Sequence, residues 1–168
     1  ALAMDGDTMV VGYPESDFDG TSSGAALVFR WQEGEWRHLA TLRAAHGMAF
    51  DGLGVSVAVG GSTVVAGAPG VDHDGSQAGG AYVFTDVSGL QDWSAVLQHR
   101  LTLPEGSASD RFGTSVACDR RAVVCGAPGV ASGRVGVAVR VSPAALGEGV
   151  PVRGSAVVGV RLKVVAGI

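Results

Sequence analysis

Apolar residues occur in short runs along this chain of 168 residues, and clusters of Gly, Asp and Ser separate the runs. The clearest set of runs occupies 53–59, 63–66, 81–85 and 93–103. No window keeps the 3.6-residue spacing of an amphipathic helix, so we predict an all-β fold with essentially no helix. The inner runs are apolar at nearly every position rather than at every second one. Such runs are typical of strands that are covered on both faces.

The second run of this set ends in a sequence that recurs along the chain. Val-Val-Ala-Gly-Ala-Pro ends at Pro69, Met-Val-Val-Gly-Tyr-Pro at Pro14 and Val-Val-Cys-Gly-Ala-Pro at Pro128, and 164–168 form a partial echo. The glycines of these motifs are separated by 55, 59 and 41 residues, which is near the repeat length of propeller blades. Proline ends each run because it cannot donate a hydrogen bond to a neighbouring strand.

We therefore predict a β-propeller fragment of about three to three and a half blades, each with four antiparallel strands, called A to D in chain order. The copies span approximately 1–48, 49–108, 109–150 and 151–168 of one partial domain, and the last two are degenerate. Propellers close with about four to eight blades, so an open strand edge is expected at each end. We expect additional blades from a larger protein, or self-association.

The charge and hydropathy of the chain argue against two classes of partner. A net charge of −4 with scattered arginines does not suit nucleic-acid binding, which needs a concentrated set of basic side chains. The twenty uncharged residues 52–71 have the length of a membrane span. However, the turn at Gly60-Gly61-Ser62 and the break at Pro69 predict two strands there, so no membrane span is expected.

Two acidic loops between strands B and C are the best polar constellation. They carry Asp17 with Asp19 and, in the next copy, Asp72 with Asp74, each pair preceding a glycine. Their carboxylates can offer oxygens to calcium. The same residues can instead stabilise the turn by bonding their own backbone. Both interpretations stay open, and no cofactor is firmly predicted.

The remaining candidates for chemistry do not converge on a catalytic site. Gly20-Thr21-Ser22-Ser23-Gly24 matches a hydrolase nucleophile pattern, but a strand follows where that pattern needs a helix, so we predict no catalytic residue. The histidines lack ligand spacing and are interpreted as surface or packing residues: His38, His46, His73 and His99. The tryptophans can stack on sugars or fill gaps between blades: Trp31, Trp36 and Trp93.

Cys118 and Cys125 flank a predicted turn and lie in adjacent strands. They can form a cross-strand disulfide or serve as two small buried apolar residues. The second interpretation is favoured because other copies carry apolar residues at the equivalent positions.

A set of short motifs recurs in register and carries a family resemblance. Its members are Phe112-Gly113 with Gly126-Ala127-Pro128, Leu53-Gly54 with Gly67-Ala68-Pro69, Gly12 with Pro14, and the strand Ala81-Tyr82-Val83-Phe84. The chain resembles the FG-GAP repeats of integrin alpha-subunit propellers, and is closest in style to their simpler microbial and algal relatives. The resemblance covers 1–141 well and 154–168 loosely.

The resemblance implies a propeller of about seven blades that serves adhesion and ligand binding outside the cell or on its surface. Family members bind calcium in acidic loops between strands A and B. Here those connections are 5–8, 60–62 and 119–121, which are too short to surround calcium with about six oxygens. The family calcium site is therefore not expected in this chain.

The predicted function is a non-catalytic FG-GAP module for protein or glycan interaction, within a larger extracellular or surface protein. The ligand is expected on the face that joins the B-to-C loops to the D-to-A loops, 46–52 and 105–111. Two alternatives remain: an accessory propeller of a secreted hydrolase, and a purely structural repeat without a ligand.

Overall fold

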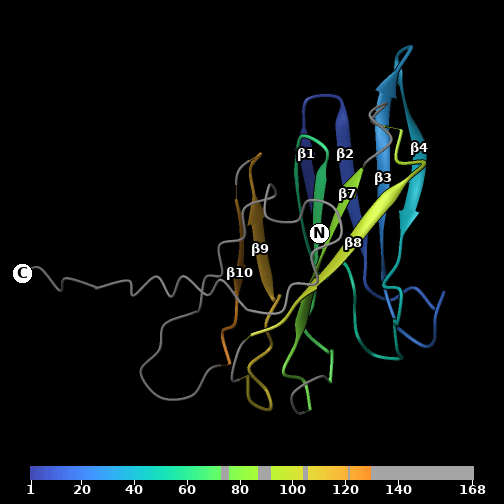
Figure 1. The fold of residues 1–168 in the computed structure, drawn as a ribbon. Helices are drawn as coiled ribbons and strands as arrows, with labels where there is room; N and C mark the ends of the chain where they lie inside the picture. Colours follow the sequence, from blue (N-terminus) through green and yellow to red (C-terminus); the bar gives the residue numbers. More distant parts are fainter. Residues whose placement is uncertain (73–75, 87–91, 104–105, 121, 130–168) are drawn as a thin grey trace, which may run out of the picture.

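The computed structural model describes residues 1–72, 76–86, 92–103, 106–120 and 122–129 (Figure 1). These residues contain strands and turns but no helix, and the strands form three antiparallel sheets of four, four and two strands. The all-β prediction is confirmed, and the arrangement is that of a β-propeller fragment. The strands expected in 134–141 and 154–168 lie outside the described residues, and the copy boundaries stay a prediction.

The first blade is a four-stranded sheet in chain order. Its strands are β1 (Leu2–Asp5), β2 (Thr8–Tyr13), β3 (Ala25–Gln32) and β4 (Glu35–Leu42). A bulge between Val28 and Phe29 shifts the register of β3 against β4. The apolar runs predict strands C and D of this copy at 25–29 and near 36–42, and both are confirmed, with β3 continuing to Gln32.

The second blade repeats this order with β5 (Ser56–Gly60), β6 (Thr63–Ala68), β7 (Gly80–Asp86) and β8 (Val96–Leu101). The stretch 52–71 is thus two strands joined by a tight turn, as expected. The first of them starts later than predicted, because Leu53 leaves the sheet and forms a bridge to Gly24 of the first blade. Strand β6 continues through Ala68 and ends before Pro69.

The third blade is described through its first two strands, β9 (Ser115–Cys118) and β10 (Val123–Gly126). Strand β5 contacts β1 on one side and β9 on the other, so the first strands of the three blades lie next to one another. Figure 1 shows the sheets arranged as successive layers in chain order.

The second blade has an apolar core on each face. Side chains that alternate along its strands enter two clusters: Val57, Val64 and Phe84 pack towards the first blade, whereas Val65 and Val83 pack towards the third. Every residue of β6 is buried as a result. The uninterrupted apolar runs of the sequence are therefore explained by packing on both faces, and each fully buried Val or Phe contributes about 1.5–3 kcal/mol.

Candidate functional site

The motif glycines lie where successive blades meet. A Cβ on Gly12 would collide with the backbone of Gly54, and a Cβ on Gly67 would collide with the backbone of Gly113. The first glycine of each pair belongs to a GAP-type motif, and the second belongs to the Leu-Gly or Phe-Gly motif of the next blade. Close approach of two backbones explains why both positions are glycine.

The apolar residue before the second glycine is inserted into the preceding blade. Leu53 and Phe112 are fully buried. The backbone N–H of Leu53 donates to the carbonyl of Ser23 at 3.0 Å, and that of Phe112 donates to the carbonyl of Ala78 at 2.9 Å. The two boundaries therefore use the same hydrogen bond at equivalent positions.

Buried aspartates brace the D-to-A loops, and the sequence analysis missed them. Asp51 Oδ2 accepts the backbone N–H of Met48 at 2.8 Å, and Asp110 Oδ2 accepts that of Ser107 at 2.6 Å. Both aspartates are about 5% exposed. The sequence does mark these two aspartates, because each aspartate lies two residues before a Leu-Gly or Phe-Gly motif. Burial raises the pKa of Asp51, which the hydrogen bond from Met48 partly offsets.

The predicted B-to-C loop aspartates make equivalent turn contacts in two copies. Asp17 Oδ1 accepts the N–H of Ser22 at 2.7 Å, and Asp72 Oδ1 accepts the N–H of Gln77 at 2.6 Å. Both donors have a positive φ, 51° for Ser22 and 57° for Gln77. These bonds are the turn chemistry that the sequence suggested. Asp74 lies outside the described residues.

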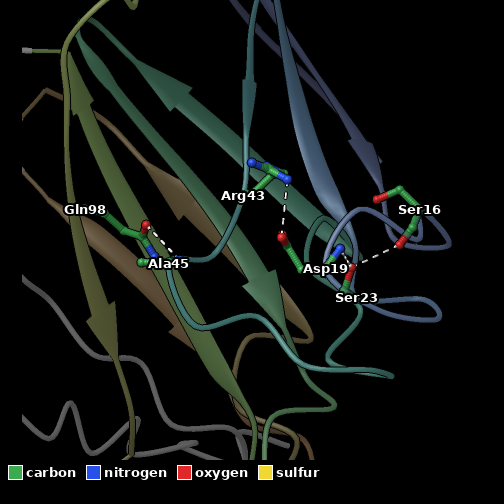
Figure 2. A network of polar contacts seen from close by, with 6 residues as sticks. All are labelled: Ser16, Asp19, Ser23, Arg43, Ala45 and Gln98. Atoms are coloured by element: carbon green, nitrogen blue, oxygen red, sulfur yellow. Dashed lines mark hydrogen bonds and ion pairs between the residues drawn. The ribbon is translucent and has the colours of Figure 1, made fainter.

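Metal binding at these loops stays a prediction. Within the ranges that the structure describes, no group of three or more His, Cys, Asp or Glu side chains is placed to hold a metal ion. Asp19 points elsewhere: its Oδ1 pairs with Arg43 Nη1 at 3.3 Å (Figure 2).

The ion pair of Asp19 and Arg43 lines a groove between the first two blades. The groove is open to solvent, has a volume of about 370 Å³ and lies between the outer strands β4 and β8. Phe84 and Trp93 contribute its apolar lining, and Trp93 is only 5% exposed. Gln98 also lines the groove, and its Oε1 accepts the N–H of Ala45 at 3.2 Å (Figure 2). The groove thus combines a cation, a carboxylate and an amide with aromatic carbon.

A buried serine holds the loop that carries Asp19. Ser23 is 2% exposed, its Oγ accepts the N–H of Asp19 at 3.1 Å, and it donates to the carbonyl of Ser16 at 3.2 Å (Figure 2). Ser23 is the variable residue that follows Ser22, the serine of the Gly-x-Ser-x-Gly pattern, and its hydroxyl is used for loop structure. Arg43 also lies over the ring of Phe18, 5.8 Å from its centroid, which helps to orient the guanidinium.

The tryptophans divide into two groups. Trp93 belongs to the core between the first two blades, which confirms the packing interpretation for this residue. Trp31 and Trp36 form an edge-to-face pair with centroids 5.4 Å apart and are 45% and 36% exposed. This pair lies at the β3–β4 turn, at the opposite end of the sheet from the B-to-C loop. A sugar-stacking role for the pair stays a prediction.

The two cysteines are free thiols, and the disulfide is not formed. Cys118 pairs across the ladder with Val123, and Cys125 pairs with Val116, so the sulfurs are not directly opposite. Burial raises the pKa of Cys118 to about 11 and that of Cys125 to about 12. Both thiols pack with the core between the second and third blades, as apolar residues do at equivalent positions.

The histidines that the structure describes lie in different parts of the fold: His38 in β4, His99 in β8 and His46 in the loop that follows β4. His38 packs edge-on against Phe29, with ring centroids 5.4 Å apart, and its Nε2 is 3.1 Å from Thr41 Oγ1. His99 has a buried Nε2. Among the described residues no helix has the length and apolar character needed to cross a membrane.

The antiparallel four-stranded blades and their glycine boundaries define a propeller-type repeat protein. The family model of the FG-GAP repeat matches residues 36–84 and 95–138, and the chain belongs to this family. Comparison with curated proteins finds no match.

Proposed function

We propose that this chain is a non-catalytic FG-GAP module that binds a protein or glycan ligand on the face of its B-to-C and D-to-A loops. The observation that carries the proposal is the groove between β4 and β8. Its volume of about 370 Å³ lies within the usual range of ligand sites. It lies where a B-to-C loop, through Asp19, meets a D-to-A loop, through Arg43.

The chemistry of the groove suits a ligand with both polar and apolar surfaces. The Arg43 side chain is 49% exposed, so its guanidinium can donate to a ligand carboxylate, sulfate or hydroxyl while it stays near Asp19. Phe84 and Trp93 supply a neighbouring apolar wall. A short protein segment or a sugar ring fits this combination. The proposed setting is extracellular or at the cell surface, within a larger protein, in keeping with the family resemblance.

A comparison of two arginine variants tests the proposal. Binding of the purified chain to a panel of glycans and matrix proteins is measured for the wild type, Arg43→Ala and Arg37→Ala. Arg37 is a matched control, because it is 48% exposed and forms ion pairs with Glu33 and Glu35 at the other end of the sheet.

We expect Arg43→Ala to weaken binding about tenfold or more, as loss of a charged hydrogen bond does, and Arg37→Ala to leave it unchanged. Absence of binding across the panel, or equal affinity of the wild type and both variants, would refute the proposal.

A further inference from the structure

The connection between the first two blades carries exposed apolar side chains. We call residues 46–55 the apolar loop. Within it Met48 is 67% exposed, Phe50 is 70% exposed and Val55 is 41% exposed. The loop joins β4 of the first blade to β5 of the second. It lies at the boundary of two blades that the structure describes, so a further blade packed on an outer sheet face would not cover it.

The loop that leads into the third blade, 59 residues further along the chain, has the same backbone structure. Phe50 has a φ of 69°, and its equivalent Ser109 has a φ of 67°. Their N–H groups both donate at 2.8 Å, to the carbonyls of Thr21 and Ser76 respectively. The buried aspartates described above brace both loops with the same hydrogen bond. The two loops are therefore the same turn, formed twice in one chain.

The side chains on this shared turn differ in kind. The apolar residues of the first loop are replaced in the second by hydroxyl residues, which are also exposed: Met48 by Ser107, Phe50 by Ser109 and Val55 by Thr114. Since the turn forms with small polar side chains, the fold does not require apolar ones. A positive φ is also unusual for a residue as bulky as Phe50, and strain of this kind is often kept for function. Large exposed apolar side chains that the fold does not need indicate a contact surface.

The loops around this surface are acidic. In 15–24, 43–52 and 70–79 Arg43 is the only Lys or Arg, whereas the acids are Glu15, Asp17, Asp19, Asp51, Asp72 and Asp74. Arg43 is itself paired with Asp19. Negative charge is therefore in excess on the loops that flank the apolar side chains. Complementary charge on a partner is positive, which disfavours anionic lipid and nucleic acid.

We propose that the apolar loop docks a protein segment in which an aromatic or aliphatic side chain lies beside lysine or arginine. The inference rests on the proposed function for the choice of face, and it names the ligand as protein. The apolar side chain of the partner packs on Met48 and Phe50, and the flexible thioether of Met48 adapts to its shape. The basic side chains of the partner face the carboxylates of Asp17 and Asp72 on the flanking loops.

A phage-displayed library of random linear peptides, selected on the purified chain, tests this proposal. Affinity of the selected peptides is then measured for the wild type and for the double variant Met48→Ser with Phe50→Ser, which copies the loop before the third blade. Met4→Ser is the matched control, because Met4 is 63% exposed and lies in β1, outside the loops. Arg43→Ala tests the groove separately. Thermal melting of every variant measures whether the substitutions affect the fold.

We expect the selected peptides to combine aromatic or aliphatic residues with lysine or arginine. The double variant should weaken their binding about tenfold or more, as truncation of a central aromatic contact does, and Met4→Ser should leave it unchanged. The melting temperature of the double variant should not fall, since serine forms the same turn at Ser107 and Ser109.

Four results would overturn the inference. Selection may yield no binding peptide, or the wild type and the double variant may bind the peptides equally. A melting temperature several degrees lower in the double variant would assign these side chains to the stability of the fold. Binding to phosphatidylcholine vesicles in place of peptides would assign the loop to a lipid surface. Peptide binding that is lost in Arg43→Ala but kept in the double variant would support the groove and contradict the apolar loop, whereas the reverse result would contradict the groove alone.

Discussion

Substitution of Gly67 by Ala should disrupt the boundary between the second and third blades. The new Cβ would lie closer than 3.0 Å to the backbone carbonyl of Gly113, a distance that real Cβ atoms do not adopt. That carbonyl also accepts the hydroxyl of Ser56 at 2.8 Å. The nearest obstructing atom is this backbone oxygen, and the Ser56 hydroxyl also lies too close, so relief requires the two blades to separate.

The expected loss of stability follows from two contributions. Overpacking of a close contact costs about 1–3 kcal/mol. Movement of Gly113 also breaks the hydrogen bond from Ser56, which contributes about 1 kcal/mol. The sum is about 3 kcal/mol, and for a chain of this size it lowers the melting temperature by roughly 6–12 °C.

Gly80→Ala provides the matched control, since Gly80 is also a buried strand residue of the second blade. The nearest atoms to its new Cβ are those of Val71 at 3.5 Å and beyond, which is ordinary contact. We expect Gly80→Ala to change stability by less than about 1 kcal/mol. Thermal and urea unfolding measure both variants. Equal stability of Gly67→Ala and Gly80→Ala would refute the proposed role of the glycine pair.

Three further predictions concern titratable groups and loops. Asp72→Ala should lower the free energy of unfolding by about 1 kcal/mol because it removes the acceptor of the Gln77 N–H, whereas Asp72→Asn keeps an acceptor and should not. A rise in melting temperature with calcium, seen in the wild type alone, would favour the metal interpretation instead. Cys118 and Cys125 should react slowly with a thiol reagent at pH 8 until the protein unfolds. Their pKa values in the folded protein are raised to about 11 and about 12, so the buried neutral thiols contribute stability that is fully present below the ordinary thiol pKa of 9.0. This contribution should disappear as the pH rises above 9.0 towards the raised values. Fast labelling of the folded protein would contradict the prediction. Burial raises the pKa of Asp51 above 3.8, so the folded state binds this proton more readily than the unfolded state does. The wild type should therefore gain stability relative to Asp51→Asn as the pH falls through the raised pKa. A difference in melting temperature between the two proteins that does not change with pH would contradict this prediction.

The strands could be predicted from sequence because local pattern and tertiary packing agree. Every residue of β6 is apolar or small and every one is buried, so its start followed from the apolar run, although the strand continues past the predicted end at Ala66 as far as Ala68, just before Pro69. The position of Leu53 could not be predicted in the same way. It continues an apolar run, but its hydrogen bond is to Ser23 of another blade, which no local pattern specifies.

The candidate site was predictable in its loops but not in its contacts. The paired acids identified Asp17 and Asp72 as turn residues because the motif recurs. The pair of Asp19 with Arg43 joins residues from different loops, and the sequence gives no spacing rule for it. Buried Asp51 was missed because an aspartate followed by a glycine is common in exposed turns, so the sequence does not show that this one is buried.

Each Leu-Gly or Phe-Gly motif is packed as part of the preceding blade. Hydrogen exchange of the backbone amides of Leu53 and Phe112 tests it most directly, because each donates to a carbonyl across a blade boundary. We expect both amides to exchange as slowly as that of Val65 in the core strand β6, through global unfolding. Exchange at the rate of an unprotected loop amide would contradict the claim.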